Sequence, residues 1–355
     1  MIIETLTTRT FPAEYLALAS NTAPDNLFTS EVWITNFLET VVAADDEVFW
    51  IGCKETNNTP LLLLPLWQKP NSNRWAGKRI SSLANYYTTL YEPLHAVTDP
   101  RKLEQIIDQV ATSICQLKWD VIEFYPLNPE SESFRLLSNA FKKQSKQVTP
   151  YFMYGNWFLL TKGKSYAEYL ADRPGQVRNT LKRKINKLKT QNLDISICQH
   201  PHEVDSAVSL FEETYRASWK QDEPYPHFIR GLAKAAAERG WLRLGLLFID
   251  QQIAAAQIWF TMADTAYIYK LCQFPTFDNY SPGTILTTHL IQYVIDNDKV
   301  TKIDFLSGDD PYKKDWMSDR GERWGLQISN PKTLYGLIQA TKNILGGLKN
   351  KIQQP

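Results

Sequence analysis

The sequence predicts an α+β protein with a mixed, mostly antiparallel sheet that contains one splayed parallel pair of strands. Three strand-like segments follow one another in the second half of the chain, at 242–249, 253–261 and 265–274. Only three residues separate each segment from the next, and connections that short allow only antiparallel hairpins. A loop and a helix at 284–296 then lead to a strand at 301–306, an arrangement typical of a right-handed parallel crossover.

A strand at 193–198 and helices at 204–218 and 228–239 precede the hairpins, so this half has the order β-α-α-β-β-β-α-β. A parallel pair within an otherwise antiparallel sheet creates a place where two strands must separate. Ligands bind at such openings, beyond the carboxyl ends of the strands. We therefore expect the functional site between the strands at 265–274 and 301–306.

The first half mixes strands and helices. Ser30, a good N-cap residue, predicts the start of a helix, because Trp33, Phe37 and Val41 then fall on one face. The other segments are strands at 1–7, 47–53, 60–67, 119–125 (ending at Pro126) and 148–154, and helices from Pro100 and over 130–145. We expect an N-terminal domain at 1–160, a second at 161–330, and a C-terminal helix at 331–355 that packs across the domains.

Length and composition limit the possible functions. The 355 residues correspond to about two domains, and the 43% hydrophobic content argues against disorder. Lys and Arg total 39 against 38 for Asp and Glu, so the formal net charge of +1 excludes a chain whose whole surface binds polyanions. Any contact with phosphate or nucleic acid must be local.

The cysteines and the apolar runs indicate a cytoplasmic protein. The four cysteines lie far apart, without a CxxC motif, so we expect reduced thiols and no metal site: Cys53, Cys115, Cys198 and Cys272. The longest obvious apolar run, 61–66, has the length of a strand and not of a membrane helix. The N-terminus lacks the pattern of a secretory signal. We expect no transmembrane segment.

A basic segment lies near the expected domain junction. Residues 171–190 contain seven basic residues and one acid, and Val177, Leu181 and Ile185 recur at helical spacing. The charge therefore lies on the open side of an amphipathic helix. This side is either a solvated surface or one that attracts the phosphate of a donor, an acceptor or a lipid headgroup. Arg178, on this helix, is a candidate substrate-binding residue.

The loop before the crossover helix suggests an anion site. It ends in Tyr280-Ser281-Pro282-Gly283-Thr284, where Pro favours a helix start and Gly allows close approach of a ligand to the backbone. The N–H groups of the first turn would face outward, at the positive end of the helix dipole, and could bind a diphosphate. A plain turn with a helix cap is the alternative.

Acidic and basic residues follow the crossover strand, in DFLSGDDPYKKDW at 304–316. Removing a proton from an attacking amine or hydroxyl needs a carboxylate, and stabilising an oxyanion or phosphate needs a lysine or a backbone donor. The candidate catalytic residues are Asp304, Asp309, Tyr312 and Lys313. The alternative is structural, with Asp304 in a cap or an ion pair and Asp309 in a turn before Pro311. The five histidines are scattered and suggest no catalytic triad.

Five segments in order, over about 165–317, carry a family resemblance. They are YLADRPGQVRNTLKRKINKL, ASWK, ERGWLRLGLLFIDQQIAAAQIWF, YSPGT and DFLSGDDPYKKDW. Together they resemble the CelD-like (cellulose-biosynthesis-protein type) branch of the GNAT acyltransferases, which is related to the Fem peptidyltransferases. FTSEVWITNFLE and RISSLANYYTTLYEPL in the first half also resemble this branch, so the resemblance covers most of the chain.

The resemblance implies tandem GNAT-like domains, the second of which holds the acyl donor. It places the pyrophosphate of acetyl-CoA or another acyl-CoA against the segment formed by Tyr280, Ser281, Gly283 and Thr284. The pair Tyr312-Lys313 looks like the aromatic-lysine element of Fem enzymes, and we assign Trp219 and Lys220 of ASWK to substrate binding. The fuller Gln/Arg-x-x-Gly-x-Gly/Ala loop of many GNAT enzymes is reduced here to Ser-Pro-Gly. The donor is therefore left open among acyl-CoA, an acyl carrier protein and a charged tRNA.

The function expected from this resemblance is N- or O-acyl transfer, with acetyl as the expected group, to a sugar, a polysaccharide precursor or another envelope metabolite. Transfer would be direct, with Asp304 or Asp309 accepting the proton, Tyr312 protonating the thiolate and Lys313 neutralising a substrate anion. The first domain would wall the acceptor side. Two alternatives remain, a Fem-like transferase that uses charged tRNA and a non-catalytic pair of domains that binds a phosphorylated ligand or a partner.

Overall fold

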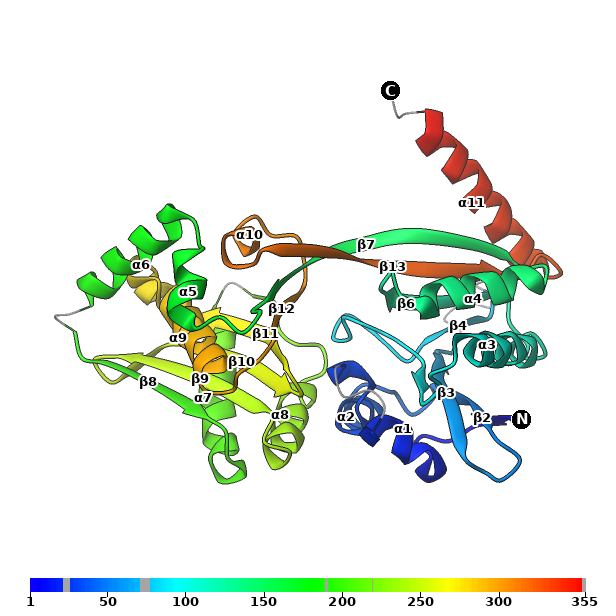
Figure 1. The fold of residues 1–355 in the computed structure, drawn as a ribbon, viewed down its shortest axis with the longest axis horizontal. Coiled ribbons are helices and arrows are strands. Elements are labelled where there is room, and N and C mark those ends of the chain that lie inside the picture. The colour runs from blue at the N-terminus through cyan, green and yellow to red at the C-terminus, as the bar shows by residue number, and fades with distance from the viewer. Residues whose placement is uncertain (22–25, 71–76, 189–190, 219, 353–355) are drawn as a thin grey trace. The chain divides into compact units, whose positions relative to one another are not determined.

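The computed structural model describes residues 1–21, 26–70, 77–188, 191–218 and 220–352 (Figure 1). The chain forms two compact units, unit 1 with residues 1–154 and 322–355 and unit 2 with residues 155–321. These limits differ from the expected ones because β7 (Gln147–Leu160) and β13 (Asp319–Ser329) each run from one unit into the other. The C-terminal helix belongs to unit 1.

Unit 1 has five α-helices and eight strands or parts of strands among its described residues. Besides the first part of β7 and most of β13, they are β1 (Ile2–Leu6), α1 (Leu16–Asn21), α2 (Glu31–Thr40), β2 (Glu47–Lys54), β3 (Pro60–Gln68), β4 (Arg79–Ser82), β5 (Leu94–His95), α3 (Pro100–Ile114), β6 (Val121–Leu127), α4 (Glu132–Lys143) and α11 (Leu334–Ile352). Hydrophobic residues of α3 and α4 form a core with β2, β3 and β6.

Local signals explain where the helices of unit 1 begin. The hydroxyl of Ser30 accepts the N–H of Trp33 at 3.2 Å, so the expected N-cap of α2 is present. The strand β6, in contrast, continues through Pro126 instead of ending there. Proline lacks an N–H, but the carbonyl of Pro126 accepts the N–H of Tyr91 at 2.6 Å, and Leu127 still pairs with Trp324.

Unit 1 also contains a parallel pair that the sequence did not reveal. β4 runs parallel to β6 over three residue pairs, from Arg79↔Val121 to Ser81↔Glu123. Only one parallel pair was predicted, in the second half of the chain. β4 was missed because four residues are too few to show a periodic pattern. With this pair, unit 1 follows the order β-α-α-β-β-β-α-β, with the short β5 inserted.

Unit 2 has the predicted order β-α-α-β-β-β-α-β. Its elements are α5 (Tyr166–Ala171), α6 (Gly175–Lys187), β8 (Leu193–Cys198), α7 (Val204–Ala217), α8 (Phe228–Glu238), β9 (Leu242–Ile249), β10 (Gln252–Met262), β11 (Thr265–Gln273), α9 (Pro282–Asp296), β12 (Lys302–Ser307) and α10 (Lys313–Trp316). The strands β8 to β11 are antiparallel neighbours, β11 and β12 are parallel, and β12 pairs with the end of β7. Figure 1 shows α5, α6 and α9 over one face of this sheet and α7 and α8 over the other.

The helix α9 is held by close packing on the sheet. Leu286 and Leu290 are fully buried and lie over Gly245 of β9, where an added Cβ would come within 3.0 Å of both leucine side chains. The glycine therefore lets the helix approach the strand closely. This packing fixes the start of α9 relative to the carboxyl end of β11.

The basic segment forms the predicted helix, α6, and a second short helix, α5, precedes it. A capping box of Ser165 and Glu168 starts α5, and Pro174 separates α5 from α6. In α6, Leu181 is 3% exposed but Ile185 is 44% exposed, so the apolar face of this helix is narrower than its sequence suggested.

The C-terminal helix exposes much of its apolar face. Five of its large apolar side chains are between 44% and 77% exposed: Leu334, Leu337, Ile338, Ile344 and Leu345. Hydrophobic periodicity identified the helix but did not determine what covers it. Among the described helices, none is both long and apolar enough to cross a membrane.

We predict that Leu290→Ala destabilises the protein by about 2–5 kcal/mol, because it opens a cavity between α9 and the sheet. Leu337→Ala is the matched control, and since Leu337 is 50% exposed its effect should stay within about 0.5 kcal/mol. Urea unfolding followed by tryptophan fluorescence measures both. Equal losses for the two variants would contradict the packing described for α9.

Candidate active site

The strands β11 and β12 separate after a short paired stretch. Their parallel register runs from Thr265↔Lys302 to Tyr267↔Asp304 and then stops, although β11 continues to Gln273. A pocket of about 240 Å³ lies beyond this point. Among the residues that line it are Lys220, Gln257, Gln273, Thr284, Phe305 and Tyr312. The predicted opening is therefore present, and the start of α9 forms part of its wall.

Asp304 is at the point where the two strands separate, and it has a structural environment. It is 2% exposed, and its Oδ1 accepts the side-chain amide of Asn156 at 2.7 Å and the backbone N–H of Leu306 at 2.8 Å. Its Oδ2 lies 3.0 Å from Nζ of Lys302. The register between β7 and β12 shifts here, between Asp304 and Ser307. The carboxylate thus holds a bulge and does not line the pocket.

Lys313 is also turned towards the backbone. The residue is 4% exposed, and its Nζ donates to the carbonyl of Ser307 at 2.5 Å and, at 3.4 Å, to those of Phe305 and Gly308. Burial lowers the pKa of this amine, while the nearby Asp310 carboxylate opposes the shift. Lys313 therefore ties down the end of β12, and the structure does not place it among the residues that line the pocket.

Asp309 is exposed and paired. Nη2 of Arg320 lies 2.6 Å from its Oδ2, and the indole N–H of Trp157 donates to its Oδ1 at 2.7 Å. These bonds, first that of Arg320, hold the pKa of the carboxyl group below its ordinary value. Gly155 permits the arrangement, because a Cβ there would come within 2.8 Å of the Asp309 side chain. A carboxylate held in this way is a weak proton acceptor.

Tyr312 is the one predicted catalytic residue that lines the pocket. Its ring meets that of Phe305 edge to face at 5.8 Å. Burial, with a smaller contribution from Asp310, raises the pKa of the phenol to about 12. The phenol is therefore protonated near neutral pH and can donate a proton.

The start of α9 differs from the expected anion site. Ser281 has the left-handed φ of 54°, and its carbonyl accepts the N–H groups of Thr284 and Ile285 at 3.1 and 3.3 Å. The N–H of Gly283 donates to Oε1 of Gln273 at 3.0 Å. The first-turn amides thus have acceptors within the chain and do not face outward unpaired. Sequence reasoning missed Gln273 because one glutamine at a strand end forms no pattern.

A buried glutamine holds α9 from below. Gln257 is fully buried, and its side-chain amide donates to the carbonyl of Gly283 at 2.8 Å and to the hydroxyl of Thr287 at 2.9 Å. Its Oε1 accepts the indole N–H of Trp259 at 3.0 Å. The floor of the pocket is therefore a satisfied polar network that fixes the first turn of α9 to β10.

The structure brings the basic helix and the predicted phosphate loop together. Nζ of Lys184 and Nζ of Lys187 donate to the carbonyl of Asn279, at 3.1 and 3.3 Å. Lys187 also lies over the ring of Tyr280, 5.0 Å from its centre. Arg178, in contrast, donates to the carbonyl of Ala171 at 2.9 Å and does not line the pocket. Local positive charge thus lies beside Tyr280 and Ser281.

Of the two substrate-binding residues expected in ASWK, Trp219 lies outside the described residues. Lys220 lines the pocket, and its Nζ lies over the ring of Tyr215 at 5.5 Å. Burial lowers the pKa of the Lys220 amine. Cys272 and Glu223 oppose this shift, while the charges of Lys270 and Lys313 add to it. A lysine with a lowered pKa can exchange a proton closer to neutral pH than an exposed lysine can.

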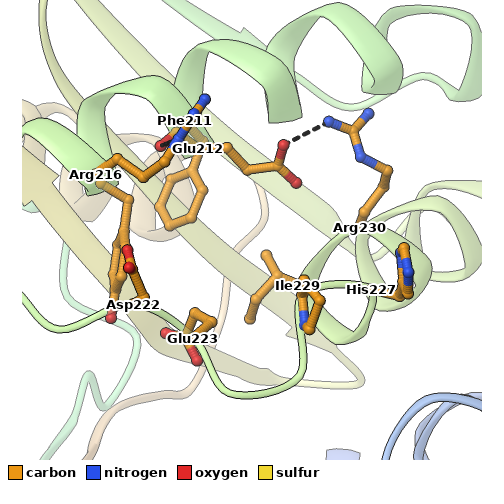
Figure 2. A pocket seen from close by; sticks show the side chains of 10 residues that line it. Phe211, Glu212, Arg216, Asp222, Glu223, His227, Ile229 and Arg230 are labelled. Carbon is orange, nitrogen blue, oxygen red and sulfur yellow. Dashed lines mark hydrogen bonds and ion pairs between the residues drawn. The ribbon is translucent and has the colours of Figure 1, made fainter.

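A second pocket of about 450 Å³ lies beside α7 and α8 (Figure 2). Phe211 and Ile229 contribute apolar surface. Several of its charged residues have partners in the chain, since Glu212 pairs with Arg230 at 2.7 Å and Glu223 pairs with Lys270 at 2.6 Å. This lining suits an uncharged group better than a phosphate.

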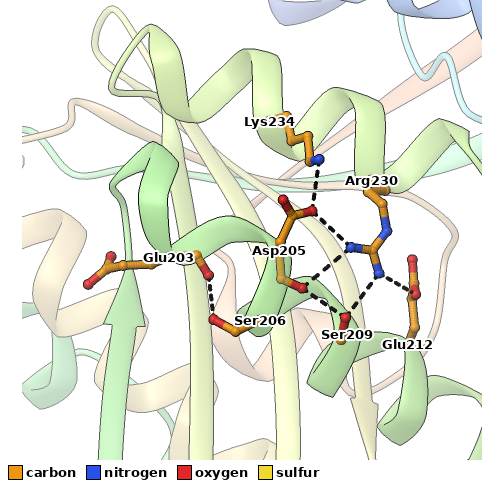
Figure 3. Close-up of polar contacts among 7 residues, drawn as sticks. All are labelled: Glu203, Asp205, Ser206, Ser209, Glu212, Arg230 and Lys234. Atoms are coloured by element: carbon orange, nitrogen blue, oxygen red, sulfur yellow. Dashed lines mark hydrogen bonds and ion pairs between the residues drawn. The ribbon is translucent and has the colours of Figure 1, made fainter.

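The charge network beside the second pocket stabilises the contact between α7 and α8 (Figure 3). Arg230 of α8 donates to Asp205 at 3.2 Å, to Ser209 at 3.2 Å and to Glu212 at 2.7 Å, all on α7. Lys234 reaches Asp205 at 2.8 Å. Because its guanidinium is bonded to these three residues, Arg230 links α8 to α7.

Residues 175–314 match the family described as "Acetyltransferase (GNAT) domain". This stretch covers α6 to the start of α10 and includes the pocket between β11 and β12. The chain carries a GNAT acetyltransferase domain. Its predicted GNAT fold is confirmed, and the protein is a GNAT-type acyltransferase. Membership of the CelD-like branch stays a prediction. No curated protein matches the sequence.

Solved structures share the fold over nearly the whole chain. The crystal structure of FemX has 12% identity and a TM-score of 0.63, over 94% of this chain and 99% of that chain. L-PGS from Bacillus licheniformis has 10% identity and a TM-score of 0.57, over 96% and 98%. The C-terminal domain of a putative lysylphosphatidylglycerol synthetase from Agrobacterium fabrum has 11% identity and a TM-score of 0.54, over 94% and 97%. At such identities the likeness concerns the fold alone.

We predict that Asp304→Asn lowers the free energy of unfolding by about 1–3 kcal/mol. The new amide keeps one oxygen for Asn156 and Leu306 but then presents an N–H₂ group to the Lys302 ammonium. Asp309→Asn, at an exposed ion pair, should have a smaller effect. Urea unfolding measures the losses, and hydrogen exchange at the Leu306 amide should become faster only in the first variant. An unchanged Leu306 amide would contradict the role of Asp304 in the bulge.

Proposed function

We propose that the GNAT domain transfers an acyl group, with acetyl as the first candidate, from acyl-CoA to an amine or hydroxyl. The acceptor is a sugar, a polysaccharide precursor or another envelope metabolite. The observation that carries the proposal is the pocket at the separation of β11 and β12, which Lys220 and Tyr312 both line. The role expected for the first domain, which is to wall the acceptor side, stays a prediction. So does the cytoplasmic location.

The residues near the start of α9 fit the phosphates of acyl-CoA in one respect. Lys184 and Lys187 lie beside the loop at Asn279 and supply positive charge. The Gly283 amide can receive a phosphate oxygen only if Gln273 gives up its bond. We therefore assign phosphate attraction mainly to the lysines of α6, with Tyr280, Ser281, Gly283 and Thr284 as the backbone beside them.

The proposed chemistry uses two side chains that line the pocket, Lys220 and Tyr312. The acceptor nitrogen or oxygen attacks the thioester carbonyl carbon, the carbon–sulfur bond breaks, and the acyl group forms an amide or ester. Lys220, in its neutral form, accepts the proton of the acceptor, and Tyr312 gives its proton to the departing thiolate and regains one from solvent. Asp304 and Asp309 hold neighbouring groups in place and do not accept the proton, because their oxygens are bonded to Asn156 and Arg320.

A charged tRNA is the second candidate donor. Lys182 and Arg183 on α6 are exposed, and the segment 171–190 carries seven basic residues against one acid. Such a surface binds polyphosphate backbones with a steep dependence on salt. The internal pairing of the Gly283 amide also leaves α9 without a ready diphosphate site.

We predict that the double variant Lys184→Gln/Lys187→Gln binds acetyl-CoA about tenfold more weakly, a loss of about 1.4 kcal/mol. Lys182→Gln/Arg183→Gln removes the same charge from the same helix and is the matched control, with little expected change. Calorimetry and thermal shift with acetyl-CoA and longer acyl-CoA, in low and moderate salt, provide the measurement.

The same series separates the two donors. No binding of any acyl-CoA by the unsubstituted protein, together with salt-sensitive binding of charged tRNA, would overturn the acyl-CoA proposal in favour of tRNA. Equal weakening in both double variants would contradict the specific placement of phosphate at Lys184 and Lys187.

We predict that Tyr312→Phe lowers kcat by roughly 10- to 100-fold, at or below the lower end of the usual effect of a general acid because a thiolate leaves readily. KM for acyl-CoA should change little. Since the pKa of the phenol is about 12, its ionisation should not limit the rate until pH approaches that value. A variant with unchanged kcat at neutral pH would exclude Tyr312 as the proton donor.

A further inference from the structure

Unit 1 contains a pocket at its own diverging pair of parallel strands. The pairing of β4 with β6 stops at Ser81↔Glu123, and a pocket of about 430 Å³ lies beyond. Asn85, Tyr125 and Tyr335 of α11 are among the residues that line it. The volume is within the range of small-molecule sites. The place in the fold is the counterpart of the pocket between β11 and β12 in unit 2.

Two hydrogen-bond donors of this pocket have no acceptor among the described residues. They are Nε1 of Trp67, whose side chain is 2% exposed, and Nδ2 of Asn85. Oδ1 of Asn85 accepts the N–H of Tyr87 at 2.9 Å, and this bond directs the amide nitrogen away from Tyr87. A buried donor without a partner costs about 1–3 kcal/mol. Two such donors in one pocket indicate a ligand rich in acceptors.

The charges of the pocket favour an anion. Nζ of Lys69 lies over the Trp67 ring, 4.6 Å from its centre, and Arg79 is 3.5 Å from the carboxylate of Glu123. Among the lining residues that the structure describes, Glu123 is the one acid. It also accepts the side-chain amide of Gln327 at 2.7 Å. Lys69 and Arg79 therefore leave a net positive charge.

The aromatic side chains of the pocket indicate which kind of chemical group carries the anion. Trp67, Tyr125 and Tyr335 line the same pocket as the two cations, and such rings pack against the apolar face of a compact cyclic group. We propose that this pocket binds an anionic sugar, that is, a sugar carrying a phosphate or a carboxylate. The anion is bound by Lys69 and Arg79, and ring oxygens or hydroxyls accept from Trp67 and Asn85. The inference concerns unit 1 and does not depend on the acyl transfer proposed for unit 2.

The test uses the full chain with glucose 6-phosphate, glucuronate, glucose and inorganic phosphate as probes, in calorimetry and saturation-transfer NMR. The two anionic sugars distinguish phosphate from carboxylate, and at least one of them should bind at least tenfold more tightly than glucose and than phosphate alone. Glucose that binds as tightly as both anionic sugars would overturn the requirement for charge. Absence of binding by both anionic sugars would overturn the proposal.

The variants locate the site. Asn85→Asp keeps the oxygen that accepts from Tyr87 but replaces the donor with negative charge, so binding of the anionic sugar should fall at least tenfold. Lys69→Gln, at an exposed position, should weaken it several-fold and serves if the first variant does not fold. Lys118→Gln, at another exposed lysine of unit 1, is the matched control. Equal effects of Lys69→Gln and Lys118→Gln would overturn the assignment to this pocket.

Discussion

The site in unit 2 depends on one buried carboxylate at the end of a paired strand. Asp304 accepts the Leu306 N–H and the Asn156 amide, so backbone that leaves the ladder at the bulge does not remain unsatisfied in the interior. Without such bonds, the cost of burying a free N–H would favour continued pairing with β11. The buried Asp304 carboxylate thus stabilises the separation of β11 and β12, although it does not line the pocket.

Bonds within the chain also explain why few of the charged side chains after β12 can take part in a reaction. Lys313 is bonded to three carbonyls at the end of β12, and Asp309 is held by Arg320. The acidic and basic residues after β12 therefore shape the loop, and the pocket keeps Tyr312 and Lys220 as its polar reactive groups. In the mechanism proposed above, catalysis rests chiefly on alignment of two reactants and on Tyr312 as a neutral acid of high pKa.

Sequence reasoning located the elements of unit 2 closely because hairpins with three-residue connections and the crossover helix leave little freedom. It also located the opening between β11 and β12 and included Tyr312 and Lys220. It proposed Asp304 and Lys313 as catalytic, whereas the structure turns both side chains towards partners within the chain. Residue type shows what a side chain can do but not which backbone group lies beside it. Gln273 and the short β4 gave no pattern, and the pairings that matter to them join residues distant in the sequence.

The bond between Gln273 and the Gly283 amide has a consequence for selectivity. An incoming oxygen must replace an amide oxygen that is already well placed, and a neutral carbonyl or hydroxyl gains little by this exchange. An oxygen with a full negative charge forms a hydrogen bond about twice as strong, so it alone has a net incentive to displace the glutamine. The bond between Gln273 and Gly283 therefore favours an anionic oxygen over a neutral one at this amide.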